Sequence, residues 1–231
     1  MLTKSKIIKG IRCKKSLWLH QNKPSEAIFE EYNQGIFAHG TDIGILARDF
    51  FHGGELALVD DYPNYSSARR TKQLILQGID TIYEATFIYD DVLVAVDILK
   101  KIDGEWNIFE CKSSTSAKAE HVLDAAIQYH VVSNSGVEVE DVFILHIDNS
   151  YIKKGSIEAS KLFKATSIKE KVLSQEEQIK FNVEILKKMQ SAGEPVIDMG
   201  KHCHHPYLCE FLEYCKKLLP STESPSTAIS E

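Results

Sequence analysis

Residues 81–114 read TIYEATFIYDDVLVAVDILKKIDGEWNIFECKSS, and this stretch predicts three consecutive β-strands. Runs rich in Val, Ile, Phe and Tyr are separated by turn residues, a pattern typical of strands joined by hairpins. Asp103-Gly104 is a strong signal for a two-residue type I′ turn. If that turn forms, counting outward from it places Asp97 opposite Glu110 on the next strand.

A second two-residue link, Asp90-Asp91, sets the register of the preceding strand in the same way. It pairs Tyr89 with Val92, and counting onward then places Glu84 opposite Asp97. Glu84, Asp97 and Glu110 would form one row across the strands. Like charges that are directly opposed, with Cβ atoms about 4.5–5.5 Å apart, destabilise a sheet, so such a row needs a cation.

The predicted sheet is apolar on both faces, which indicates that both are covered. Strand alternation puts the acids on a face with seven apolar residues: Ile82, Ile88, Leu93, Ala95, Leu99, Trp106 and Ile108. Lys112 shares this face, because it follows Glu110 by two residues. An acid in such a setting is either paired or holds a metal. A structural cluster of Asp97, Lys112 and Glu110 is the alternative to a metal site.

The remaining pattern predicts an α/β fold. A helical pattern covers residues 27–51, a second covers residues 118–133, and a third begins at Ser174 and ends near residue 189. Residues 141–147, DVFILHI, predict a strand. The order strand, helix, strand implies a right-handed crossover to a parallel neighbour, so we expect a mixed sheet.

Length and charge exclude several classes of protein. With 231 residues, we expect one domain over residues 1–219, followed by a disordered tail rich in Ser, Thr and Pro over residues 220–231. A net charge of −6 gives no global attraction to nucleic acid. No segment is apolar enough to span a membrane, and the basic N-terminus does not resemble a secretory signal, so a cytoplasmic location is expected.

Cysteines form the second group of candidate functional residues. Cys203, Cys209 and Cys215 recur at even spacing near the C-terminus, and Cys13 could add a fourth thiolate. Four cysteines suit an iron–sulfur cluster or tetrahedral zinc, and a histidine at 202, 204 or 205 could replace one of them. Burial of the thiols as small apolar groups is the alternative. Cys111 alternates to the opposite face of the strand and reads as a core residue.

These features together resemble the PD-(D/E)XK nuclease superfamily in its RecB-like form. The resemblance rests on Asp97, on Glu110-Cys111-Lys112 and on Gln128-Tyr129. The early cysteine and the three late cysteines are similar to those of the iron–sulfur members, such as the CRISPR-associated exonucleases and the AddB-type helicase-nucleases. The family implies a restriction-endonuclease-like mixed sheet flanked by helices. It also implies that residues 1–20 and 200–217 are helical segments joined by a 4Fe–4S cluster.

The resemblance implies a metal-dependent DNA exonuclease. Asp97, Glu110 and the Cys111 carbonyl would hold Mg²⁺ or Mn²⁺, with His39 or Asp42 as a further ligand. Lys112 would orient water and stabilise developing charge, and Glu84 would lie in the outer shell of the site. Gln128 could bind phosphate or Lys112, and Tyr129 could contact the DNA strand. A surface amide, a core aromatic and a structural histidine are the alternatives for Gln128, Tyr129 and His39.

The expected partner is DNA, as single strands or duplex ends, and further candidates are a helicase or a protein of repair, CRISPR adaptation or antiviral defence. DNA contact would come from a basic N-terminal segment, for which a solvated helix face is the alternative: Lys4, Lys6, Lys9, Arg12, Lys14 and Lys15. Two other functions compete with the exonuclease. One is a catalytically inactive nuclease fold that binds nucleic acid or protein, and the other is a zinc-stabilised interaction module.

Overall fold

The computed structural model describes residues 1–28 and 43–219. The strands are β1 (Leu2–Thr3), β2 (Glu55–Leu56), β3 (Thr81–Tyr89), β4 (Val92–Ile102), β5 (Glu105–Lys112), β6 (Val139–Ile147) and β7 (Phe163–Ser167). The larger helices are α1 (Lys4–Arg12), α2 (Lys14–Asn22), α4 (Tyr65–Leu76), α5 (Ala119–Asn134) and α8 (Glu176–Gln190). Shorter helices are η1 (Pro24–Glu26), α6 (Ala159–Leu162), α7 (Lys169–Leu173), η2 (Lys201–Cys203) and α9 (Leu212–Lys217). Residues 43–50 are also helical.

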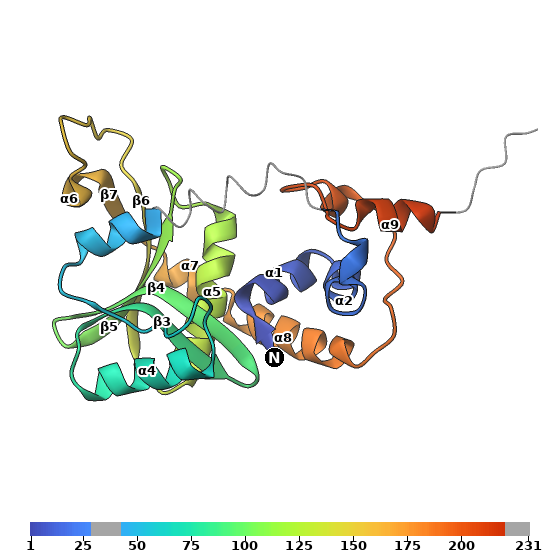
Figure 1. Ribbon diagram of the computed structural model, residues 1–231, viewed down its shortest axis with the longest axis horizontal. Helices are drawn as coiled ribbons and strands as arrows, with labels where there is room; N and C mark the ends of the chain where they lie inside the picture. The colour runs from blue at the N-terminus through green and yellow to red at the C-terminus, as the bar shows by residue number, and fades with distance from the viewer. Residues whose placement is uncertain (29–42, 220–231) are drawn as a thin grey trace, which may run out of the picture.

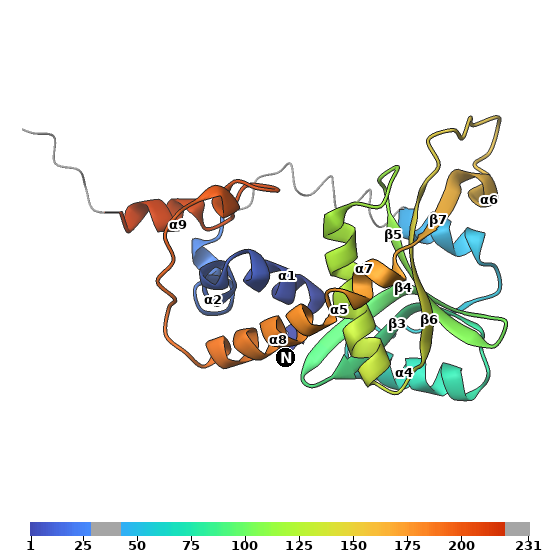
Figure 2. The same ribbon diagram turned by 180° about the vertical axis from the view of Figure 1, so that it is seen from behind.

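The strands form one seven-stranded mixed sheet flanked by helices, so the predicted α/β class is confirmed. The strand order is β2-β3-β4-β5-β6-β7, and β1 pairs with β4 beside that path. In Figures 1 and 2 the sheet lies at one end of the molecule, and α1, α2, α8 and α9 lie at the other. Among the helices that the structure describes, none has the length and apolarity needed to cross a bilayer.

Both predicted hairpins are confirmed. Ile102 pairs with Glu105, and Tyr89 pairs with Val92. Asp103 and Gly104 have φ of 52° and 92°, the positive values that a type I′ turn requires. Asp90 and Asp91 adopt similar values, 46° and 59°. The predicted parallel neighbour is confirmed as well, because β6 follows α5 and runs parallel to β5.

Strand alternation reverses at the pair Glu84 and Asp97. Glu84 has φ of 53°, and the ladder on both sides of it keeps the predicted register. Ile82 and Ala85, three residues apart, both lie in the larger core cluster, as do Val96 and Leu99. The predicted assignment of residues to the two faces is therefore wrong from this pair to the Asp90-Asp91 turn. Ile88, Leu93 and Ala95 were predicted on the face of Leu99, but Phe87, Val92 and Val94 share the core cluster with Leu99.

Helices cover both faces of the sheet, as predicted. Helix α5 packs across β3, β4, β5 and β6 and buries the larger cluster (Figure 2). The helix over residues 43–50 contributes Ala47 to a smaller cluster on the other face, with Tyr83, Ile98, Phe109 and Leu145. Cys111 packs against this smaller cluster, which agrees with its prediction as a core residue. The central strands are therefore enclosed on two sides, and charged groups on them need partners.

Two helix boundaries differ from the predictions. Residues 27 and 28 are not helical, whereas residues 43–50 are, and the segment between them lies outside the described residues. Ser174 does not cap α8; it ends α7 and donates its hydroxyl to the Lys171 carbonyl, and α8 starts at Glu176. The short edge strands β1 and β7 were not predicted, because a few residues carry too little periodicity to detect.

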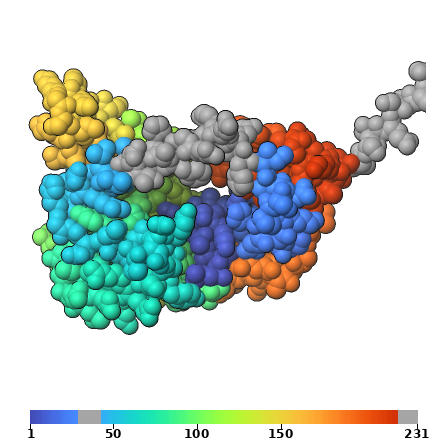
Figure 3. All heavy atoms as spheres, viewed as in Figure 1, coloured from blue at the N-terminus to red at the C-terminus, as the bar shows by residue number. Residues whose placement is uncertain are grey.

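The N-terminal segment lies between the sheet and the helices of the other end (Figure 3). Thr3 caps α1 by accepting a hydrogen bond from the Lys6 N–H. Gly10 lets α1 approach α2 and α8 closely, because a Cβ atom there would lie 2.5 Å from a methyl carbon of Leu186 and 2.8 Å from one of Leu17. Helix α1 is thereby fixed between the sheet and α8.

Candidate active site

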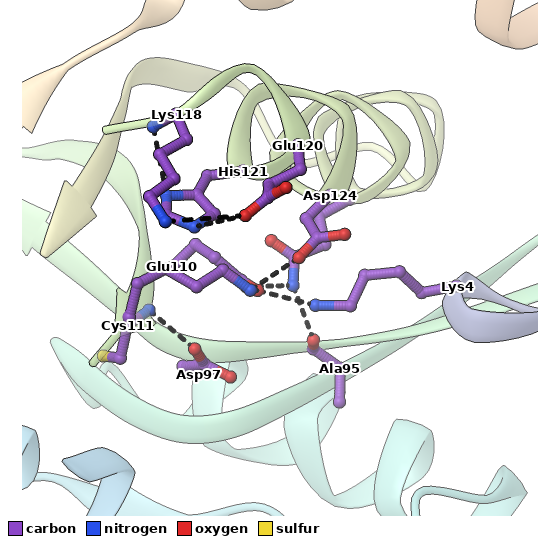
Figure 4. Close-up of polar contacts among 11 residues, drawn as sticks. Lys4, Ala95, Asp97, Glu110, Cys111, Lys118, Glu120, His121 and Asp124 are labelled. Carbon is purple, nitrogen blue, oxygen red and sulfur yellow. Dashed lines mark hydrogen bonds and ion pairs between the residues drawn. The ribbon is translucent and has the colours of Figure 1, made fainter. Parts of the chain in front are cut away.

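Strands β4 and β5 separate at the point where the predicted acids face each other. Their ladder ends at the pair Ile98 and Phe109, one position before Asp97 and Glu110. Beyond that pair, the Asp97 carboxylate accepts a hydrogen bond of 2.7 Å from the Cys111 backbone N–H. Figure 4 shows Asp97 and Glu110 on these neighbouring strands. The hairpin register therefore places the two carboxylates on neighbouring strands, where the ladder between the strands has ended.

Glu110 is the centre of the site. It is 1% exposed, and both of its carboxylate oxygens are bonded. Oε1 accepts from the ammonium of Lys112 at 2.7 Å and from that of Lys4 at 2.8 Å. Oε2 accepts from the Gln128 side-chain amide at 2.6 Å. Lys112 lies beside Glu110, as strand periodicity predicts, whereas Gln128, which was expected to bind phosphate or Lys112, bonds Glu110.

Gln128 is fully buried and leaves one polar atom unpaired. Its Nε2 donates to Glu110 and to the Ala95 carbonyl, at 2.9 Å for the latter, which fixes the orientation of the amide. Its Oε1 has no hydrogen-bond partner among the described residues. An unpaired buried oxygen costs about 1–3 kcal/mol, so a donor is expected there, such as a bound water. Gln128 is not a surface amide.

The two carboxylates have opposite pKa shifts. Burial alone would raise the pKa of Glu110, but the ammonium groups of Lys4 and Lys112 outweigh burial and lower it to about 2. Burial raises the pKa of Asp97 to about 7, and the charges of Glu110 and Glu84 add to this effect. Glu110 has two ammonium partners, whereas the Lys4 charge only partly offsets the effect of burial on Asp97. A cation bound beside Asp97 would favour its charged form and lower its pKa.

Replacing Asp97 with asparagine should stabilise the metal-free protein. The pKa of Asp97 is about 7 in the folded protein, against an ordinary value of 3.8, so the unfolded chain loses this proton first. The free energy of unfolding therefore falls as the pH rises from about 4 through 7. At pH 8 in EDTA we expect Asp97→Asn to raise the free energy of unfolding by about 1–3 kcal/mol, and the gain to shrink at pH 5. Urea unfolding at both pH values measures this, with exposed Asp61→Asn as the control. A loss of stability at pH 8, or an equal gain at both values, would contradict the assignment.

Asp124 is a site residue that the sequence did not reveal. It lies on α5 one turn before Gln128, and its carboxylate is 2.5 Å from the Lys112 ammonium. Lys112 is therefore held between Glu110 and Asp124, and these two carboxylates raise its pKa despite burial. The spacing of four residues between Asp124 and Gln128 was the available signal, because it places both side chains on one helix face.

The other predicted residues lie further from Glu110. Tyr129 packs against the larger core cluster and takes no part in the hydrogen bonds that join Glu110, Lys112 and Gln128. Glu84 pairs with Arg48 at 3.2 Å, and its charge also raises the pKa of Asp97, which lies opposite it in the predicted register. His39 and Asp42 lie outside the described residues.

The basic N-terminal segment mainly holds the two ends of the chain together. Lys9 pairs with Glu210, Lys15 pairs with Glu194 at 3.4 Å, and Arg12 donates to the His202 carbonyl at 2.8 Å. Lys4 forms an ion pair with Glu110. These contacts involve four of the six basic residues that were expected to contact DNA.

The four cysteines of the predicted cluster line one small cavity between the chain ends. Its walls include Cys13, Cys203, Cys209 and Cys215, and all four are free thiols. Burial raises the pKa of the Cys13 thiol; the backbone N–H groups of Ser16 and Lys15 counteract this shift, and the neighbouring thiols of Cys209 and Cys203 add to it. Within residues 1–28 and 43–219, no three His, Cys, Asp or Glu side chains are arranged to hold a metal ion.

Comparison with known proteins identifies no family. No protein-family model matches the chain, and no curated protein matches it. Fourteen chains of known structure are similar to it. One, described as the crystal structure of SSO0001, is 13% identical with a TM-score of 0.45, and the alignment covers 96% of this chain and 87% of that chain. A similarity of this size assigns neither a family nor a function.

Proposed function

We propose that this protein is a metal-dependent deoxyribonuclease that hydrolyses phosphodiester bonds at DNA ends. The observation that carries the proposal is the placement of Asp97 and Glu110 on neighbouring strands, with Lys112 bonded to Glu110 and the charge of Glu110 raising the pKa of Asp97. Carboxylate oxygens are the hard donors that Mg²⁺ and Mn²⁺ prefer. Burial and the charge of Glu110 raise the pKa of Asp97, so a bound cation would stabilise the charged form of this carboxylate.

Each residue has a role that follows from its contacts. Asp97 and Glu110 would hold a divalent ion, with the Cys111 carbonyl as a further ligand. When bound, that ion would polarise a phosphate oxygen and lower the pKa of a water. Lys112 would donate to the phosphate oxygens that become more negative during hydrolysis. Asp124 would hold Lys112 in position, and Gln128 would hold Glu110 and accept a hydrogen bond at Oε1.

We also propose that Cys13, Cys203, Cys209 and Cys215 hold a 4Fe–4S cluster that joins the chain ends. The support is a donor set of four free thiols around one cavity, drawn from both ends of the chain. Zinc is the alternative, because it accepts the same four thiolates. The cavity lies among α2, η2 and α9, away from the sheet, so this group would have a structural role.

Degradation of end-labelled DNA by the purified protein tests the function. Linear single strands and blunt duplexes should be shortened with Mn²⁺ or Mg²⁺ and remain intact in EDTA. Closed circular DNA should also remain intact, which separates attack at ends from internal cleavage. The isosteric change Glu110→Gln should reduce the rate by about 10²-fold or more. If the wild type binds DNA without cutting it in either metal, the protein is an inactive nuclease fold and the proposal is overturned.

A further inference from the structure

Lys4 is an unexpected residue at the candidate active site. Its ammonium lies 2.8 Å from Glu110 Oε1, and Lys112 Nζ lies 2.7 Å from the same oxygen. The two residues are 106 positions apart in the chain. Figure 4 shows Lys4 approaching Glu110 from the N-terminal segment, opposite to the strand that carries Cys111. The site therefore contains two lysines.

Sheet pairing accounts for the position of Lys4. Strand β1 pairs with the first half of β4, at Leu2 with Val92 and Thr3 with Leu93. Strand β5 pairs with the second half of β4, from Ile98 onward. Lys4 directly follows β1, so it enters the space that is left between β1 and β5. The Glu110 carboxylate meets the Lys4 ammonium there, and the Lys4 charge also lowers the pKa of Asp97 against the effect of burial.

The contacts of Lys4 make it easier to displace than Lys112. Among the described ion pairs, Lys112 has two carboxylate partners, Glu110 and Asp124, whereas Lys4 has only Glu110. Both oxygens of Glu110 are already bonded, so a metal ion that binds Glu110 must displace a donor or compete with it. An ammonium on a flexible four-carbon stem can leave without any change in the backbone.

We propose that Lys4 is an internal counter-ion of Glu110 that competes with the divalent metal and thereby sets the metal affinity of the site. This inference rests on the proposed function, because it requires Asp97 and Glu110 to bind the metal. In the metal-free protein Lys4 neutralises Glu110 and keeps the fold intact. Metal binding moves the ammonium away from Oε1, and the two cations exclude each other by charge.

Mn²⁺ binding measured by electron paramagnetic resonance tests the proposal without any use of activity. Lys4→Met keeps an unbranched side chain one atom shorter than lysine and removes the charge, and Lys4→Gln is a second neutral variant. Both should bind Mn²⁺ more tightly than wild type, on the order of tenfold. Lys187→Met is a matched control, because Lys187 is also partly buried (29% exposed against 24% for Lys4) and has one described carboxylate partner, Asp90. This control should leave the affinity unchanged.

The outcomes separate this inference from the proposed function. If wild type binds Mn²⁺ and Asp97→Asn does not, the metal site stands. An unchanged or weaker affinity in both Lys4 variants then overturns the counter-ion role alone. If those variants instead weaken DNA binding at constant Mn²⁺ affinity, Lys4 is a phosphate contact and the inference is also overturned. If Mn²⁺ binds neither wild type nor the Lys4 variants, both proposals fail. Circular dichroism of each variant verifies folding.

Discussion

Replacing Lys112 with alanine should reduce metal-dependent DNA cleavage by about 10²- to 10³-fold, the cost of losing one preorganised donor to developing charge. The ammonium is held at 2.7 Å from Glu110 and 2.5 Å from Asp124, so it points into the site without reorganisation. Because Glu110 keeps Lys4 and Gln128 as partners, the variant should fold. Initial rates on labelled single strands in Mn²⁺ measure the effect.

Lys169→Ala is the matched control for this change. Lys169 is 31% exposed and Lys112 is 22% exposed, and Lys169 pairs with Glu140 on another part of the sheet. Its loss should leave the rate unchanged. Equal rates for wild type and Lys112→Ala would mean that another site, or a contaminant, cuts the DNA, and the assigned mechanism would then be wrong.

Replacing Cys13 with serine should remove the metal from the cysteine cavity and loosen the C-terminal segment. The wild type, purified without oxygen, should be brown and contain about four iron atoms per chain if a 4Fe–4S cluster is present. Cys13→Ser should lose most of that iron, because this cysteine brings the N-terminal end to the three late cysteines. Iron analysis measures the loss, and limited proteolysis measures the exposure of residues 195–217.

Cys111→Ala provides a control within the same chain. Cys111 packs against the smaller core cluster and does not line the cysteine cavity, so its loss should leave the iron in place. Zinc in place of iron would support the alternative metal. If neither metal copurifies, and reconstitution restores neither, the cysteines are buried apolar residues and the cluster proposal is wrong.

The sequence predicted those parts of the site that local turns determine. Asp103-Gly104 and Asp90-Asp91 each bring their strands together through two residues with positive φ. Because a turn fixes the register of the whole hairpin, counting from it correctly brought Asp97 and Glu110 to neighbouring strands. The proximity of Lys112 to Glu110 also followed from strand periodicity alone.

Features that depend on distant parts of the chain were not predictable. The reversal at Glu84 depends on a residue with φ of 53°, a conformation that a glutamate in a strand pattern does not signal. Lys4 reaches Glu110 through the pairing of a two-residue strand, which has no detectable period. Asp124 is brought to Lys112 by the packing of α5 against β5. The reversal at Glu84 and the positions of Lys4 and Asp124 all belong to the tertiary structure, which local sequence patterns do not reveal.

Helix α1 has a consequence for how the two ends of this molecule influence each other. Its first residue, Lys4, contacts Glu110, and the residue that follows its last turn, Cys13, borders the cysteine cavity. Nine residues of helix span about 13–14 Å, so one helix joins the surroundings of Glu110 to the thiols. A displacement of one end of this helix would therefore be passed on to the other, so the packing around the thiols and the position of the Lys4 ammonium are mechanically coupled.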